Sequence, residues 1–353
     1  MRMNPLELLK DKILDLPVIQ GGMGVGVSLS SLAGAVAREG GMGVISSAQI
    51  GFEDPDFLRH PHESNLSALD CHVRRAKEIS MGKGLVGVNI MVALQDYANS
   101  VKTACEAGVD AIISGAGLPL ELPKFVEGFQ TAIAPIVSSA KAASVILKHW
   151  TRKYNRTADF LVVEGPKAGG HLGFKPEQLM ANIAATYDDE IRSIIAVKKE
   201  YEEKFKRKIP LFVAGGIFTA GDVEHALDLG ADGVQCATRF VVTEECDASR
   251  AYKQAYIDAN AEDVSIIKSP VGMPGRALRN SFIRRVEEGM FPITKCYRCL
   301  KACDPRTAPY CITQALVNAV KGNLEEGLIF CGERVSELKE MTTVKKLMQE
   351  LTV

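Results

Sequence analysis

The 353-residue sequence lacks the features that mark a membrane protein or a secreted protein. No run of 18 or more apolar residues is free of charge, so a transmembrane helix is not expected. The N-terminal stretch carries Lys10, Asp11, Lys12 and Asp15 where a secretory signal needs an unbroken apolar run. Neither sign of charge is in excess, because 42 Lys+Arg stand against 43 Asp+Glu, a formal net charge of -1. We therefore expect a small-molecule substrate, and neither nucleic acid nor a membrane as partner.

The sequence also lacks the composition of a disulfide-stapled or disordered chain. Its nine cysteines are an odd number spread over a long chain, which favours a reducing, cytoplasmic location. The hydrophobic fraction is 46% and the charged fraction is 24%, both close to the average of globular proteins. We expect a sizeable core, in one large α/β domain with an appendage or in two ordinary domains.

Eight short apolar runs have the length of β-strands, and each is followed by a stretch of helical period. The runs are nearly continuous in Val, Ile and Leu, which is typical of parallel strands covered on both faces. The predicted strands are residues 16–19, 42–46, 85–89, 111–113, 133–137, 160–164, 211–214 and 233–236.

The eight alternations of strand and helix match the size and rhythm of a (β/α)8 TIM barrel. A doubly wound α/β sheet is the alternative. We expect the barrel over residues 1–260, and a helical, Cys-containing lobe over residues 261–353 that packs on the barrel and partly covers the active face. Residues 51–65 are predicted to be a mobile loop near that face. Helices are predicted over residues 28–38, 67–79, 96–107, 140–150 and 220–229, and from 176 to about 208, the last with Ile194, Val197, Tyr201 and Phe205 on its apolar face.

Two loops, after the seventh and eighth predicted strands, carry the pattern of a phosphate site. In barrels these loops commonly bind phosphate, because glycines let backbone N–H groups approach the anion. Paired glycines also make ordinary tight turns, and that simpler interpretation stays open. The residues concerned are Ala214, Gly215 and Gly216 in the first loop, and Gln235, Cys236, Ala237 and Thr238 in the second.

A glycine-rich stretch, residues 22–26, follows the first predicted strand. It lacks the last glycine of the dinucleotide fingerprint G-x-G-x-x-G, and no acidic ribose partner ends the next strand. Such a loop can instead let the backbone lie against a flat ring, with Gln20 offering a side-chain amide. Ordinary turn formation is the alternative.

His171 stands at the end of a glycine-rich loop, residues 164–171, after the sixth predicted strand. A histidine at the catalytic end of a barrel can reach a ligand, and its ordinary pKa lets it exchange protons near neutral pH. The other five histidines fall in the long loop or on predicted helices, where solvated side chains are expected. His171 is therefore the candidate catalytic residue.

Five segments together resemble the nitronate monooxygenase family, formerly called 2-nitropropane dioxygenases. FMN-containing enoyl-ACP reductases share the same motifs. The resemblance covers roughly residues 15–290 and implies a (β/α)8 barrel that holds FMN non-covalently, with the phosphate on the two loops described above. The segments are PVIQGGMG (17–24), EGPKAGGHLG (164–173), VAGGI (213–217), GVQCATRFVVTEE (233–245) and PGRALRN (274–280).

By this resemblance, His171 would face the reactive side of the flavin. Lys167 departs from the family pattern because an acidic residue is common there, Ala237 replaces a usual glycine, and the serines at 138–139 replace a basic residue of some members. A positive charge near the ring would favour reduced, anionic flavin. The residues expected at the FMN are Gln20, Gly21, Gly22, Met23, Asn89, Glu164, Ala168, Gly169, Gly170, Ala214, Gly215, Gly216, Gln235, Cys236, Ala237 and Thr238.

Four cysteines near the C-terminal end, Cys296, Cys299, Cys303 and Cys311, are separated by two, three and seven residues. Four thiolates at such spacing are sufficient for tetrahedral zinc or for an iron-sulfur cluster. The spacing resembles the cluster-binding segment of flavin-dependent dienoyl-CoA reductases, in which the last gap is longer. Reduced cysteines without a metal are the alternative.

The favoured function is an FMN-dependent oxidoreductase that oxidises alkyl nitronates, followed by reaction of the reduced flavin with oxygen. The second hypothesis is reduction of an activated C=C bond, as in enoyl-ACP, or of a quinone by NAD(P)H at the same flavin. A third is a barrel that binds a phosphorylated ligand without flavin chemistry. A homo-oligomer is compatible with all three.

Overall fold

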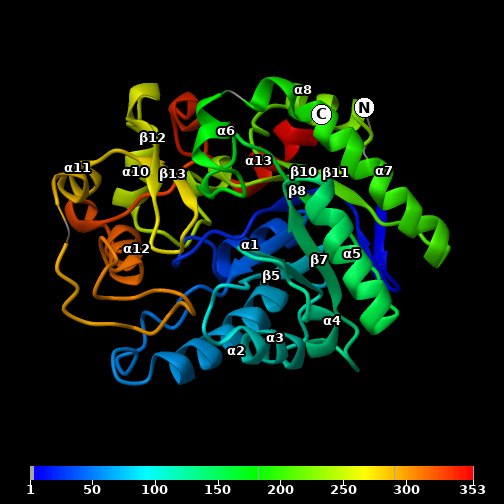
Figure 1. Ribbon diagram of the computed structural model, residues 1–353, viewed down its shortest axis with the longest axis horizontal. Coiled ribbons are helices and arrows are strands. Elements are labelled where there is room, and N and C mark those ends of the chain that lie inside the picture. Colours follow the sequence, from blue (N-terminus) through cyan, green and yellow to red (C-terminus); the bar gives the residue numbers. More distant parts are fainter. Residues whose placement is uncertain (1–3, 182, 290, 353) are drawn as a thin grey trace.

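The structure, a computed structural model, describes residues 4–181, 183–289 and 291–352. Eight parallel strands close into a barrel in the order β10-β11-β3-β4-β5-β6-β7-β8, with helices around it (Figure 1). Pairing of β8 with β10 closes the ring, which confirms the TIM barrel and excludes the doubly wound sheet. The strands are β3 (Val18–Gln20), β4 (Met42–Ser46), β5 (Leu85–Met91), β6 (Ala111–Gly115), β7 (Ala132–Val137), β8 (Leu161–Glu164), β10 (Leu211–Ala214) and β11 (Gly233–Cys236).

The barrel interior is filled by apolar side chains from most of its strands. Phe160 and Phe212 meet edge to face inside it, with ring centroids 5.7 Å apart. Met42 and Val44 join the same cluster and are fully buried. The other face of each strand packs against the outer helices, so neither face of the sheet contacts solvent. This explains why the strand sequences are apolar runs without alternation.

An antiparallel hairpin of β1 (Leu6–Leu9) and β2 (Lys12–Leu14) precedes the barrel. Leu8 and Leu14 are buried in the cluster that fills the barrel interior. Asp11 makes the turn with φ of 65°, a conformation that Asp tolerates better than most residues. The sequence analysis missed this hairpin, because strands of three and four residues give too little pattern to identify.

The loop predicted over residues 51–65 is shorter than expected, and two of its aromatic side chains are buried. Helix α2 begins at Pro61, a residue favoured in the first turn because its φ is already helical. Phe52 and Phe57 are buried, and Phe57 stacks on Tyr297 with ring centroids 5.6 Å apart. The helices beside the barrel include α1 (Ser30–Arg38), α2 (Pro61–Ser80), α3 (Tyr97–Glu106), α4 (Leu122–Phe125), α5 (Ala140–Tyr154) and α8 (Ala220–Asp228).

The single helix predicted from 176 to about 208 is wrong. The chain forms α6 (Pro176–Met180), a 3-10 turn η1 (Ile183–Thr186) and α7 (Tyr187–Phe205), while residue 182 lies outside the described residues. No residue of α6 is buried, whereas α7 buries Ile191, Ile194 and Ile195. The helical apolar period that supports a long helix is therefore confined to α7.

The chain after the barrel strands builds a lobe beside the barrel mouth (Figure 1). Its hairpin pairs with a two-residue strand of the barrel loop, in the order β12-β13-β9, through Gly275 opposite His171. The last helix, α13, packs against α1 and α8 in the outer layer of the barrel. The elements are β9 (Gly170–His171), α9 (Thr238–Val241), α10 (Arg250–Ile257), β12 (Val264–Lys268), β13 (Pro274–Leu278), α11 (Ser281–Glu288), α12 (Ile312–Val320) and α13 (Val344–Thr352).

None of the helices over the described residues combines the length and the apolar character needed to cross a bilayer.

Candidate active site

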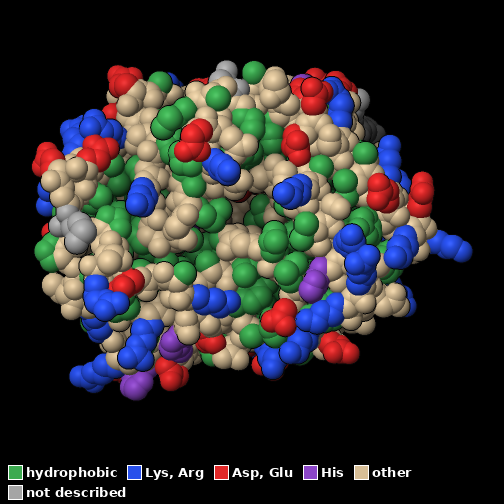
Figure 2. All heavy atoms as spheres, in the orientation of Figure 1, with side chains coloured by type: hydrophobic (Ala, Val, Ile, Leu, Met, Phe, Trp, Pro, Cys, Tyr) green, Lys and Arg blue, Asp and Glu red, His purple; other side chains and the backbone are tan. Residues whose placement is uncertain are grey.

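A cavity of about 390 Å³ lies at the carboxyl ends of the barrel strands. Figure 2 shows a hollow near the middle of this face, with hydrophobic side chains at its rim and Lys and Arg side chains around it. A cavity of this size is in the usual range for small-molecule sites. It brings together all the predicted cofactor-binding residues except Gln20, and with them His171, namely Gly21, Gly22, Met23, Asn89, Glu164, Ala168, Gly169, Gly170, Ala214, Gly215, Gly216, Gln235, Cys236, Ala237 and Thr238.

Gln20 does not line the cavity. Its side chain is fully buried between two barrel strands, where Oε1 accepts the Val44 N–H at 3.0 Å and Nε2 donates to the carbonyl oxygen of Gly21. The amide therefore links β3 to β4. The expectation that Gln20 faces a flat ring is wrong, because strand register places its side chain inside the barrel wall.

One end of the cavity is a glycine cradle on neighbouring loops. Gly215 and Gly216 have φ of 89° and 96°, values that L side chains rarely adopt. A Cβ on Gly215 would lie 2.7 Å from the Gly165 carbonyl oxygen, so only glycine fits. Because β10 pairs with β11, Ala237 and Thr238 follow on the adjacent loop. The two predicted phosphate loops thus lie side by side.

Two basic side chains lie at the cradle. A Cβ on Gly216 would be 3.1 Å from Cδ of Lys167, so the Lys167 stem packs over this glycine. Arg334 donates to the Gly216 carbonyl oxygen at 3.2 Å and pairs with Asp222 at 2.6 Å. Lys167, which departs from the family pattern, therefore lies at the cradle end of the cavity.

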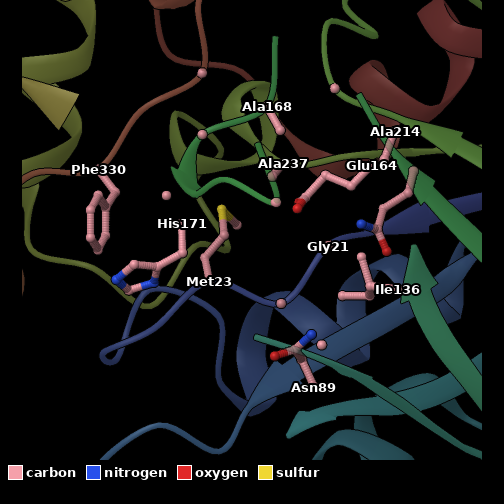
Figure 3. Close-up of a pocket in the computed structure, with 18 of the residues that line it drawn as sticks. Gly21, Met23, Asn89, Ile136, Glu164, Ala168, His171, Ala214, Ala237 and Phe330 are labelled. Carbon is pink, nitrogen blue, oxygen red and sulfur yellow. The ribbon is translucent and has the colours of Figure 1, made fainter. Parts of the chain in front are cut away.

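The cavity wall formed by the ends of the barrel strands combines close backbone with two polar side chains, Asn89 and Glu164. A Cβ on Gly22 would lie 2.6 Å from Cβ of Asn89, so a side chain there would displace the amide. Burial raises the pKa of Glu164 to about 7, so protonated and ionised forms coexist near neutrality. Figure 3 shows the side chains of Glu164 and Asn89 extending into the cavity from the barrel.

His171 lies across the cavity from Glu164, beside Phe330 (Figure 3). The two rings meet edge to face with centroids 4.9 Å apart, and Nε2 is 2.7 Å from Oγ of Ser269. Burial lowers the pKa of His171 to about 4, well below the near-neutral value of a free imidazole. The ring is therefore neutral at pH 7, and it is a weaker base than its sequence position alone suggests.

A strap from the C-terminal lobe, residues 330–334, closes one side of the cavity. The sequence analysis expected this lobe to cover part of the active face but did not identify these residues. Gly332 N–H donates to Thr238 Oγ1 at 3.2 Å, and Glu333 N–H donates to the Lys167 carbonyl oxygen at 3.2 Å. Gly169 is needed for this contact, since a Cβ there would lie 2.5 Å from the backbone of Cys331. A strap held by backbone groups leaves no motif in the sequence.

Arg276 fixes the loop that carries His171. Arg276 is 7% exposed, and its guanidinium donates to the carbonyl oxygens of Pro166 and Ala168. The strap adds to this arrangement, because Cys331 N–H donates to the Arg276 carbonyl oxygen at 3.1 Å. The segment PGRALRN therefore positions the glycine-rich loop from outside the barrel.

The segment 51–65 does not line the cavity. It lies instead beside the lobe segment that holds the cysteines, where Lys295 Nζ donates to the Leu58 carbonyl oxygen at 2.5 Å. Ser138 and Ser139 do line the cavity, and Ser139 also caps α5 by accepting the Ala142 N–H at 3.2 Å.

The four C-terminal cysteines gain no support as a metal site. Within the residues that the structure describes, no group of three or more His, Cys, Asp or Glu side chains is arranged to hold a metal ion. Burial, with a smaller effect of neighbouring cysteines, raises the pKa of Cys299 to about 11, and the pKa of Cys303 and Cys311 is also raised. Without a bound metal, these three groups are therefore protonated thiols at neutral pH.

The donor set of the cavity fits FMN. The glycine cradle, with Thr238 and two cations beside it, suits a phosphate, while the close backbone of Gly22 and the amide of Asn89 suit a flat polar ring. Both groups of residues line one cavity, as a molecule with a ring at one end and a phosphate at the other requires.

A sequence model of the nitronate monooxygenase family matches residues 7–353. The chain belongs to this family. Its members are FMN-dependent oxidoreductases, and the resemblance found in the sequence motifs is confirmed over nearly the whole chain.

Individual relatives are distant. A probable nitronate monooxygenase of Bacillus subtilis is 23% identical, covering 98% of this chain and 97% of that protein. A (3aS,4S,5R,7aS)-5-hydroxy-7a-methyl-1-oxo-octahydro-1H-indene-4-carboxyl-CoA dehydrogenase of Mycobacterium tuberculosis is 26% identical, covering 78% of this chain and 66% of that protein. The solved structure of FabK from Thermotoga maritima superposes with a TM-score of 0.71 at 25% identity, covering 98% of this chain and 93% of that one.

Proposed function

We propose that this nitronate monooxygenase family member oxidises alkyl nitronates, using FMN bound in the barrel cavity. The single observation that carries the proposal is the neutral, half-buried imidazole of His171 in the cavity, across from Glu164. A nitronate is already deprotonated at carbon, so its oxidation needs an oriented hydrogen-bonding partner more than a strong base. FMN, when bound, would accept the electrons of the nitronate and pass them to oxygen.

The protein would supply binding and orientation. The loops of Gly215–Gly216 and Ala237–Thr238 would hold the phosphate, with Lys167 and Arg334 adding positive charge near it. Asn89 and Glu164 would hydrogen-bond the ring, and Glu164 can act as a donor when it is protonated, since its pKa is about 7. The strap, with Phe330 at its start, would restrict access of water to the site.

The cofactor is expected to be FMN rather than FAD. The cradle is built for one phosphate on two barrel loops, and the stretch 22–26 lacks the glycine spacing that holds a pyrophosphate. Mass spectrometry of the cofactor released from the purified protein would check this, and FAD in the released fraction would contradict the assignment of the cradle.

A second candidate function is NAD(P)H-dependent reduction of a C=C bond conjugated to a thioester. The observation in its favour is the presence of long apolar side chains in the cavity lining, which suit an acyl chain, namely Met91, Leu118, Met273 and Leu316. The relative named as a CoA-ester dehydrogenase adds weight to it. Nitronate oxidation remains our first proposal, because the neutral His171 suits an anionic nitronate and is a poor proton donor for the reductive reaction.

Anaerobic stopped-flow mixing separates these functions. We expect a short-chain alkyl nitronate to bleach the flavin absorbance rapidly, and NADH and NADPH to bleach it slowly or not at all. Admission of oxygen should then restore the oxidised spectrum. Rapid bleaching by NADH or NADPH together with inertness toward nitronates would overturn the proposal in favour of the reductase.

A further inference from the structure

The turn of the β12–β13 hairpin holds a buried serine against the candidate catalytic histidine. Ser269 is 2% exposed, and its Oγ lies 2.7 Å from Nε2 of His171. The main chain fixes this geometry, because β13 pairs with β9 with Gly275 opposite His171. The ring of Phe330 contacts the imidazole from the side. His171 therefore has little freedom to turn away from Ser269.

The hydroxyl proton of Ser269 needs an acceptor, because a buried donor without a partner is unfavourable. The oxygen already accepts the Val271 N–H at 3.3 Å. Among the hydrogen bonds of the described residues, the other partner of this oxygen is Nε2 of His171. If Nε2 carried a proton, it would donate to Oγ and the hydroxyl proton would be left without an acceptor. If Nε2 is bare, it accepts the hydroxyl proton and both groups are satisfied.

We propose that Ser269 holds His171 in the tautomer with its proton on Nδ1. A neutral imidazole has one N–H and one bare nitrogen, and Ser269 occupies the bare one. The ring then offers the substrate an N–H donor and no base. The role of this donor rests on the nitronate oxidation proposed above: it can hold an oxygen of an anionic nitronate, but it cannot remove a proton from the carbon of a neutral nitroalkane. Ser269 is thus a positioning residue that makes the site selective for nitronates.

Nitrogen NMR of the holoprotein labelled with ¹⁵N-histidine reads the tautomer directly, with His171→Ala identifying the signals. We expect the Nδ1–H pattern in the wild type, a shift toward Nε2–H in Ser269→Ala, and return of the Nδ1–H pattern in Ser269→Thr, which keeps the hydroxyl. Ser265→Ala is the matched control, because Ser265 is on the same hairpin and its hydroxyl donates to the Ala277 carbonyl oxygen instead. An Nε2–H pattern in the wild type, or no change in Ser269→Ala, would overturn the assignment.

Kinetics supply a second readout. In Ser269→Ala, kcat/KM for a nitronate should fall about 10-fold for one misplaced hydrogen bond, and the ratio of nitronate to nitroalkane turnover should fall with it. FMN content should stay unchanged, since Ser269 lies outside the cavity lining. If the wild type turns over no nitronate but shows the Nδ1–H pattern, the proposed function fails while the tautomer assignment stands. Equal loss toward both substrates in Ser269→Ala would contradict the selectivity.

Discussion

Gly215→Ala is expected to give a protein that is purified with little or no flavin. The native φ of 89° is unfavourable for alanine, and the added Cβ would lie 2.7 Å from the Gly165 carbonyl oxygen and 3.1 Å from the Ala168 nitrogen. Both obstacles are backbone atoms, so no side-chain rotation relieves them. Either the loop of Gly215 or the loop of residues 165–168 must move, and both line the cavity. Strain of about 1–3 kcal/mol corresponds to roughly 5- to 150-fold weaker FMN binding.

Fluorescence titration of the apoprotein with FMN and with riboflavin measures this effect. Riboflavin lacks the phosphate, so Gly215→Ala should weaken FMN binding more than riboflavin binding. Gly221→Ala is the control, because Gly221 follows six residues later on α8 and its added Cβ would meet only Thr219 Oγ1, at 3.7 Å. Stoichiometric FMN in purified Gly215→Ala would show that the phosphate is not held by this loop.

The barrel could be predicted from the sequence because its physical cause is local. Each strand is covered on both faces, so runs such as residues 85–89 and 211–214 are apolar throughout and stand out from the helical stretches around them. The loops after β10 and β11 could be placed at one phosphate site because adjacent strands in a parallel barrel end at the same edge. The order of the strands and the positions where they end were enough to predict which loops form this part of the cavity.

Other parts of the site depend on contacts that no local pattern contains. Gln20 has the position of a ring-facing residue in sequence, but the register between β3 and β4 sends its amide to Val44. The strap of residues 330–334 approaches through backbone groups, which any sequence possesses. The low pKa of His171, a residue of β9, arises from burial against the hairpin turn and Phe330, both of which are distant from it in the chain. Tertiary packing, rather than residue type, decides all three.

His171→Ala is expected to retain FMN and to lose about 10²- to 10³-fold in kcat/KM toward nitronates, as when one preorganised donor to a developing charge is removed. The cofactor should remain because His171 lies across the cavity from Glu164 and Ala214, away from the strand that leads into the phosphate cradle (Figure 3). Steady-state oxygen consumption with a nitronate, set against the flavin absorbance of the same preparation, checks both halves of this expectation.

The pH profile and a donor-bearing variant distinguish catalysis from a structural role. Because burial lowers the pKa of His171 to about 4, the wild type should show no inflection from this group between pH 6 and 8 and should change as His171 gains charge near pH 4. An inflection near pH 7 belongs to Glu164, whose pKa is about 7, and should persist in His171→Ala while the inflection near pH 4 disappears.

His171→Gln, which keeps an N–H donor, should recover part of the nitronate rate. If His171→Ala is purified as apoprotein, or if it keeps wild-type rates with every nitronate, His171 does not act on the substrate.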